Sequence, residues 1–154
     1  MSPQGYVGVV GPSGDPGRVV LQVAEEVGRL LGSAGAVVVT GGGTGVMEAA
    51  SRGAAGAGGT TLGILPGTDR AEGNAHLTLS VPTGLGELRN ALLVRSVDVV
   101  VAVGGSWGTL SEVALACRTG VPVLSLLGWE LPGEGGPVVV ADPAEAVARA
   151  LEVL

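Results

Sequence analysis

Two glycine-rich segments and two charged residues are the parts of this sequence that could do chemistry. The segments read Thr40-Gly41-Gly42-Gly43-Thr44-Gly45-Val46-Met47 and Gly104-Gly105-Ser106-Trp107-Gly108-Thr109. Each follows a short apolar run and precedes a helical pattern. Glycines let backbone N–H groups come close to a ligand, and a helix start adds free donors and a positive dipole end. Both segments are therefore predicted to bind an anion such as phosphate, the alternative being two tight turns in a glycine-rich chain.

The charged residues are Arg89 and Glu112. Arg89 falls in the first turn of a predicted helix, and Glu112 follows Thr109 by three residues. Both are expected at the carboxyl edge of one parallel sheet, where helices that follow strands begin. An arginine beside a carboxylate at a phosphate site fits a catalytic or anchoring pair. Two structural alternatives stay open, because Thr109 and Glu112 have capping-box spacing and a surface ion pair contributes little.

Other candidates carry weaker signals. Gly11 and Ser13 follow the first apolar run and either contact the ligand or form a plain turn. Trp107 lies inside a predicted ligand loop, where it either stacks on a base or packs against the protein. His76 has no partner at the spacing of a metal site, and Cys117 falls in an apolar helical pattern. We therefore predict neither a metal site nor a resident cofactor.

Short, Val-rich apolar runs alternate with helical patterns along the chain. The runs are predicted as strands buried on both faces, at Tyr6–Val10, Ala36–Thr40, Thr61–Leu65, Leu77–Val81, Val97–Val103, Val121–Leu126 and Val138–Ala141. The helices are predicted at about Pro16–Leu31 (with Asp15 as N-cap), Val46–Ala57, Leu85–Ser96, Thr109–Arg118 and Pro143–Leu154 (behind an Asp142 cap). This alternation predicts a Rossmann-like α/β fold. It is a doubly wound, mostly parallel sheet of about seven strands with helices on both faces, in a single domain over residues 1–154.

Composition excludes several classes of protein. The chain has 154 residues, of which 46% are hydrophobic and 14% charged, and its net charge is −6. Disorder is excluded by the apolar content, and the sequence shows no basic stripe, membrane-length apolar run or secretory signal. We expect a cytoplasmic protein that binds neither nucleic acid nor a membrane. All eight basic residues are Arg, so the chain has no lysine for a pyridoxal phosphate Schiff base or a Walker A loop.

The two loops and the arginine together resemble the LONELY GUY (LOG) family of cytokinin-activating phosphoribohydrolases. The family hallmark is P-G-G-x-G-T-x-x-E, with an earlier G-G-G loop and an arginine on the helix between them. The residues that fall on this pattern are Gly41–Gly43, Met47, Arg89, Gly105, Trp107, Gly108, Thr109 and Glu112. Gly104 stands at the hallmark's Pro and Ser106 at its second Gly, and Asn90 follows the arginine. These departures are closer to a sister branch that is similar to the molybdenum cofactor carrier proteins.

The resemblance implies hydrolysis of the N-glycosidic bond of a nucleoside 5′-monophosphate. Glu112 would stabilise an oxocarbenium-like transition state, and Arg89 would orient Glu112 or contact the ligand. The phosphate would be held by the Thr109 hydroxyl and the amides of Gly42, Gly43, Gly105 and Gly108. The alternative is a non-enzymatic carrier or sensor of a phosphorylated pterin-type cofactor or nucleotide, and a third possibility is a structural domain without a ligand. The resemblance also implies a homodimer or homotetramer.

Overall fold

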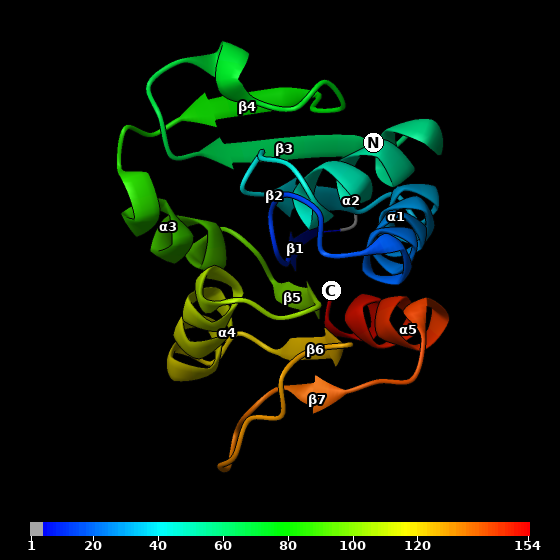
Figure 1. Cartoon of the computed structure of the whole chain (residues 1–154). Coiled ribbons are helices and arrows are strands. Elements are labelled where there is room, and N and C mark those ends of the chain that lie inside the picture. The colour runs from blue at the N-terminus through cyan, green and yellow to red at the C-terminus, as the bar shows by residue number, and fades with distance from the viewer. Residues whose placement is uncertain (1–4) are drawn as a thin grey trace.

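The fold is built on seven parallel strands in the order β4-β3-β2-β1-β5-β6-β7 (Figure 1). The computed structural model describes residues 5–154. The strands are β1 (Tyr6–Val10), β2 (Val37–Thr40), β3 (Thr60–Leu65), β4 (Leu79–Pro82), β5 (Val99–Val103), β6 (Val123–Leu126) and β7 (Val138–Val139). Every neighbouring pair is parallel, which confirms the predicted doubly wound α/β architecture.

Helices cover both faces of the sheet. They are α1 (Arg18–Ser33), α2 (Val46–Gly56), α3 (Arg89–Arg95), α4 (Trp107–Thr119) and α5 (Pro143–Val153), with short 3₁₀ turns η1 (Arg70–Glu72) and η2 (Gly86–Leu88). Helices α1, α2 and α5 lie on one face, and α3 and α4 lie on the other (Figure 1). Alternate residues of a strand point to opposite faces of the sheet. Val9 therefore packs in the core under α1, α2 and α5, and Val10 packs in the core under α3 and α4.

Three helix starts differ from those predicted, and α4 begins at Trp107 and not at Thr109. Helix α1 begins at Arg18 behind Gly17, whose φ of 100° is non-helical, and the Asp15 carboxylate accepts from the Gly17 amide instead of capping the helix. The prediction of an Asp15 cap was therefore wrong. The predicted helix over Leu85–Ser96 divides into η2 and α3, so Arg89 becomes the first residue of α3.

The cap of α5 is as predicted. The Asp142 carboxylate accepts a hydrogen bond of 2.8 Å from the Glu145 amide, and the Glu145 carboxylate accepts one of 2.7 Å from the Ala141 amide. These contacts are structural, and they satisfy backbone donors at the helix start.

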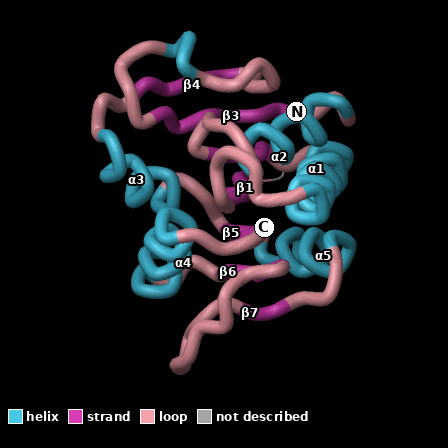
Figure 2. The backbone as a smooth tube through the Cα atoms, viewed as in Figure 1, coloured by secondary structure: helices cyan, strands magenta, loops and turns pink. Residues whose placement is uncertain are grey.

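The loops after β1, β2 and β5 lie side by side at the carboxyl edge (Figure 2). The Val46 amide donates to the Pro12 carbonyl at 3.0 Å, and the Gly14 amide donates to the Thr44 hydroxyl at 3.0 Å. The chain order along the sheet reverses between β1 and β5, which is where open α/β sheets bind ligands. Among residues 5–154, no helix is long and apolar enough to cross a membrane.

Candidate functional site

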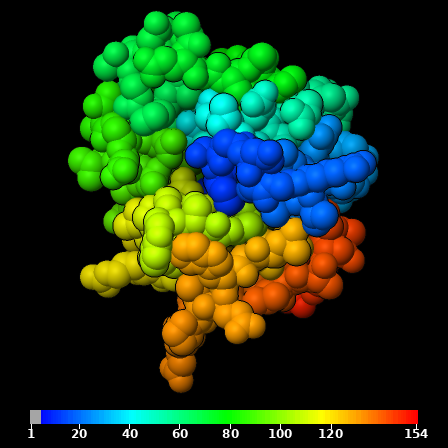
Figure 3. Space-filling model, in the orientation of Figure 1, coloured from blue at the N-terminus to red at the C-terminus, as the bar shows by residue number. Residues whose placement is uncertain are grey.

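A pocket of about 380 Å³ lies at this carboxyl edge. In the space-filling view a hollow is visible where the blue loop after β1, the green segment before α3 and the yellow start of α4 approach one another (Figure 3). Predicted residues that line the pocket are Gly11, Ser13, Met47, Arg89, Ser106, Gly108, Thr109 and Glu112. The volume suits a small ligand, since ligand pockets usually measure about 300–1,000 Å³.

Arg89 and Glu112 form a buried pair in this pocket. The Arg89 Nη1 atom lies 3.6 Å from Glu112 Oε1, and the two side chains are 13% and 8% exposed. The alternative of a surface ion pair is therefore wrong. The two groups come from neighbouring helices on the same face of the sheet, Arg89 from the first residue of α3 and Glu112 from the second turn of α4.

Hydrogen bonds hold Arg89 in place from two sides. Its Nη1 donates to the Asn90 side-chain oxygen, and its Nη2 donates to the Gly41 carbonyl at 3.5 Å. The Asn90 amide group in turn donates to the Ser111 hydroxyl at 3.1 Å, which donates to the Gly108 carbonyl at 2.7 Å. This chain of bonds ties the start of α3 to the start of α4. The Arg89 Nε is buried and has no hydrogen-bond partner among the described residues.

Gly41 makes room for the arginine. A Cβ atom at this position would lie 2.6 Å from Arg89 Nη2 and 2.8 Å from the Met47 sulfur, closer than real Cβ contacts. The first glycine of the Thr40–Met47 segment therefore positions the guanidinium group, which is a different role from the predicted phosphate contact.

Burial has the largest effect on the pKa values of Glu112 and Arg89. It raises the pKa of Glu112 to about 7, although the neighbouring Arg89 charge opposes the rise. Burial likewise lowers the pKa of Arg89, and the Glu112 charge opposes that change. Because the two groups are not hydrogen-bonded to each other, their attraction does not offset the loss of water. Near neutral pH the Glu112 carboxyl can therefore both hold and release a proton.

The start of α4 presents free donors to the pocket. Ser106 is the N-cap, and its hydroxyl accepts from the Thr109 amide at 3.2 Å and lies 2.9 Å from the Thr109 hydroxyl. The alternative of a capping box from Thr109 and Glu112 is therefore wrong, and the Glu112 side chain lines the pocket instead. Within residues 5–154, no acceptor is found for the Trp107 and Gly108 amides. A helix start with free N–H groups is a site for an anion.

The segment after β2 serves mainly to pack the loops. The Gly42 amide, expected to bind phosphate, donates to the Thr40 hydroxyl at 3.0 Å. A Cβ atom on Gly45, whose φ is 67°, would lie 2.3 Å from the Pro12 carbonyl oxygen. Of this segment, Met47 is the residue that lines the pocket, and Gly41 lies behind Arg89 and Met47.

Gly105 and Trp107 lie beside the pocket. A Cβ atom on Gly105 would meet the Trp129 ring at 2.6 Å, so this glycine accommodates an indole. The Trp107 and Trp129 rings meet edge to face, with centroids 5.0 Å apart and planes at 78°. Trp107 is nevertheless 79% exposed, and it lines a neighbouring hollow.

Four lining residues were missed by the sequence reasoning, namely Pro66, Gly86, Glu87 and Asn90. Pro66 follows β3, so its position at the carboxyl edge could have been inferred. Asn90 adjoins Arg89 in the sequence, but nothing there indicated that its side chain would bind the arginine. Among the described residues, no group of three His, Cys, Asp or Glu could hold a metal ion.

Comparison with known proteins assigns the family. The sequence model of the SLOG cluster4 family matches residues 4–146. The chain belongs to this family. A curated relative of this SLOG protein is an uncharacterised protein of Archaeoglobus fulgidus, which is 38% identical over 120 residues, 78% of each chain.

Solved structures resemble the SLOG protein along nearly its whole length. The molybdenum cofactor binding protein of Rippkaea orientalis is 35% identical, with a TM-score of 0.88 over 97% of this chain and 95% of that one. The molybdenum cofactor carrier protein of Chlamydomonas reinhardtii is also 35% identical, with a TM-score of 0.86 over 99% and 98%. DNA processing protein A of Helicobacter pylori, 20% identical with a TM-score of 0.74 over 96% and 80%, shares the fold alone.

Proposed function

We propose that this SLOG protein binds a phosphorylated pterin-type cofactor and carries it without chemical change. The observation that carries the proposal is the likeness to a molybdenum cofactor binding protein and a molybdenum cofactor carrier protein over nearly the whole chain. These comparisons support the carrier alternative better than the hydrolase that the LOG resemblance implies.

The pocket supplies the chemistry that a phosphorylated cargo needs. The free amides of Trp107 and Gly108 lie at the positive end of the α4 dipole, and Arg89 lies on the pocket wall. A phosphate at this helix start would accept from the amides and gain the attraction of the guanidinium group.

A second candidate function is phosphoribohydrolase activity, which the Arg89–Glu112 pair favours. Glycoside hydrolysis needs a carboxyl group that can give a proton to the leaving group or stabilise positive charge at the anomeric carbon. With its pKa raised to about 7, Glu112 has both forms available near neutral pH. Both functions would use the same phosphate site.

One pair of assays tests the proposal. The protein is mixed with molybdenum cofactor freshly released from a molybdoenzyme, passed through gel filtration, and analysed for molybdenum and pterin in the protein peak. In parallel it is incubated with nucleoside 5′-monophosphates, and free base is measured by chromatography. Near-stoichiometric cofactor with no free base supports a carrier. Free base without retained cofactor would support the hydrolase. If the protein neither retains the cofactor nor releases base, both functions would be overturned.

A further inference from the structure

A second hollow, of about 460 Å³, adjoins the pocket between α3 and α4. Glu87, Asn90 and Gly108 line both spaces, so the two lie next to each other at these residues. We call the second space the ring hollow. Its remaining wall is largely apolar, with Leu88, Ala91, Trp107 and Leu115 among its members.

Trp107 gives the ring hollow a flat aromatic surface next to the anion site. Its amide is one of the free donors at the start of α4, so an anion bound there would lie close to the indole. The edge-to-face contact with Trp129 occupies at most one face of the Trp107 ring. Another face stays open, and the ring is 79% exposed. Planar heterocycles stack on such exposed aromatic rings.

Glu87 supplies an acceptor at the junction of the two spaces. Its side chain is exposed and makes no hydrogen bond or ion pair with any residue in the range 5–154. An ionised carboxylate only accepts, and its two oxygens can receive two parallel N–H groups. It would therefore pair with a ring edge that presents adjacent donors and not with one that alternates donor and acceptor.

We propose that the ring hollow holds the heterocycle of the ligand whose phosphate binds at the start of α4. The ring stacks on Trp107, and the Glu87 carboxylate accepts from its edge. The edge that fits is a 2-amino-4-oxo-pyrimidine, which presents a ring N–H beside an amino group and is shared by pterins and guanine. Adenine presents an unprotonated ring nitrogen beside its amino group. This inference rests on the proposed function, because it requires a phosphorylated ligand in the adjoining pocket.

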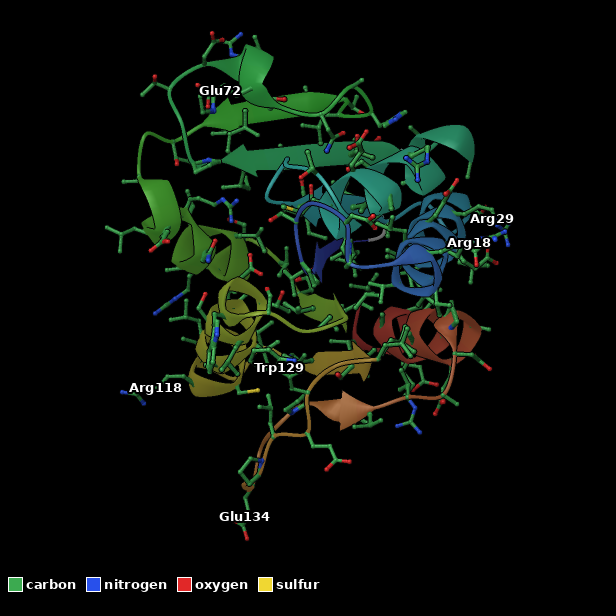
Figure 4. All side chains as sticks on the ribbon, in the orientation of Figure 1. Arg18, Arg29, Glu72, Arg118, Trp129 and Glu134 are labelled. Atoms are coloured by element: carbon green, nitrogen blue, oxygen red, sulfur yellow. The ribbon has the colours of Figure 1, made fainter. Side chains whose placement is uncertain are left out.

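Four soluble probes test the ring subsite: GMP, IMP, AMP and ribose 5-phosphate. GMP should bind more tightly than IMP by roughly tenfold, because IMP lacks the amino group that would donate to a charged acceptor. Glu87→Gln should remove this preference, while Glu134→Gln, at the tip of a loop far from the pocket (Figure 4), should not. Equal affinities of wild type for GMP and IMP would overturn the edge recognition.

Trp107 is tested with the same probes. Trp107→Ala should weaken the binding of GMP by at least about fivefold and leave the binding of ribose 5-phosphate unchanged, since only GMP carries a base that stacks on the indole. Trp107→Phe should restore most of the loss. In Trp129→Phe, where Trp107 is the sole tryptophan, GMP should quench fluorescence and ribose 5-phosphate should not.

The outcomes separate this subsite from the proposed function. If wild type binds ribose 5-phosphate and GMP with equal affinity, and Trp107→Ala changes neither affinity, the ring subsite would be overturned. The phosphate pocket would still be supported. If the protein binds none of the four probes and does not bind molybdenum cofactor, both the ring subsite and the proposed function would be overturned. A fall in oligomeric mass of Trp107→Ala by light scattering would show that a second copy of the chain covers the ring hollow, and would also overturn the subsite.

Discussion

Arg89 and Glu112 lie with Nη1 and Oε1 3.6 Å apart, and neither group hydrogen-bonds to the other. The guanidinium group is bonded instead to Asn90 and Gly41. A buried ion pair stabilises a protein only where hydrogen bonds satisfy both partners. Both residues line the pocket, where a ligand would add the bonds that the two groups do not make with each other.

The first prediction concerns pH and stability. The folded pKa of Glu112 is about 7, above the ordinary 4.5, so between these values the folded state holds a proton that the unfolded state has released. The stabilisation from this group is complete below about pH 4.5 and is lost as pH rises through about 7. The shift corresponds to roughly 3 kcal/mol. Glu112→Gln should therefore gain stability relative to wild type by about that amount between pH 5 and pH 8.

Urea denaturation of both proteins across this range measures the effect. The difference in unfolding free energy between the two should grow with pH. A difference that is constant from pH 5 to pH 8 would show that Glu112 has an ordinary pKa.

A second prediction tests the role of Gly41. The added Cβ of Gly41→Ala would press on the ends of Arg89 and Met47, which are flexible, so we expect the side chains to move and the fold to remain. Stability should fall by no more than about 1–3 kcal/mol. Affinity for ribose 5-phosphate should fall roughly tenfold, because hydrogen bonds to a charged group are among the stronger ones.

The matched control is Gly56→Ala. Gly56 ends α2, and a Cβ atom there would meet nothing within 4 Å. Alanine favours a helix over glycine, so this variant should keep its affinity and its stability. If both variants bind alike, the guanidinium position does not depend on Gly41.

The arrangement of the sheet and the positions of Arg89 and Glu112 were predictable because they depend on periodicity and on handedness. Alternating Val-rich runs and helical patterns determine a parallel sheet, and right-handed crossovers place the helix starts at one edge. Arg89 and Glu112 were brought to that edge by this rule alone.

Side-chain hydrogen bonds were less predictable. Ser106 and Thr109 are both acceptable caps, and only the three-dimensional turn decides that Ser106 caps α4 and Glu112 faces the pocket. Gly41 and Gly42 read as phosphate contacts, but one makes room for Arg89 and the other bonds to Thr40. Glycine spacing shows where the backbone comes close to something, and it does not show whether that neighbour is a ligand or the protein.

A third prediction excludes pyridoxal phosphate chemistry. The chain has no lysine, because all eight of its Lys and Arg residues are arginine. No side chain can form the internal Schiff base that such enzymes need. Incubation with pyridoxal phosphate should give no stoichiometric aldimine absorbance after desalting, and lysine should not be decarboxylated. Retained aldimine together with turnover of lysine would contradict this.

The last prediction separates a carrier from an enzyme through Glu112→Gln and Arg89→Ala. Glutamine keeps the shape of Glu112, and Ser106 remains the cap of α4, so the fold and the affinity for ribose 5-phosphate should be retained. If wild type releases base from any nucleoside 5′-monophosphate, Glu112→Gln should lower kcat by about 10²–10³ with little change in KM, as expected for a contact made in the transition state.

Arg89→Ala should weaken binding under either function, because it removes a positive charge from the pocket wall. Base release and binding of ribose 5-phosphate are therefore measured side by side for wild type and both variants. Equal rates of base release from wild type and Glu112→Gln would remove Glu112 from the chemistry. Absence of base release from wild type, with cofactor binding that Arg89→Ala weakens and Glu112→Gln does not, is the pattern expected of a carrier. In that case the raised pKa of Glu112 reflects only the burial of a carboxyl group beside the cargo.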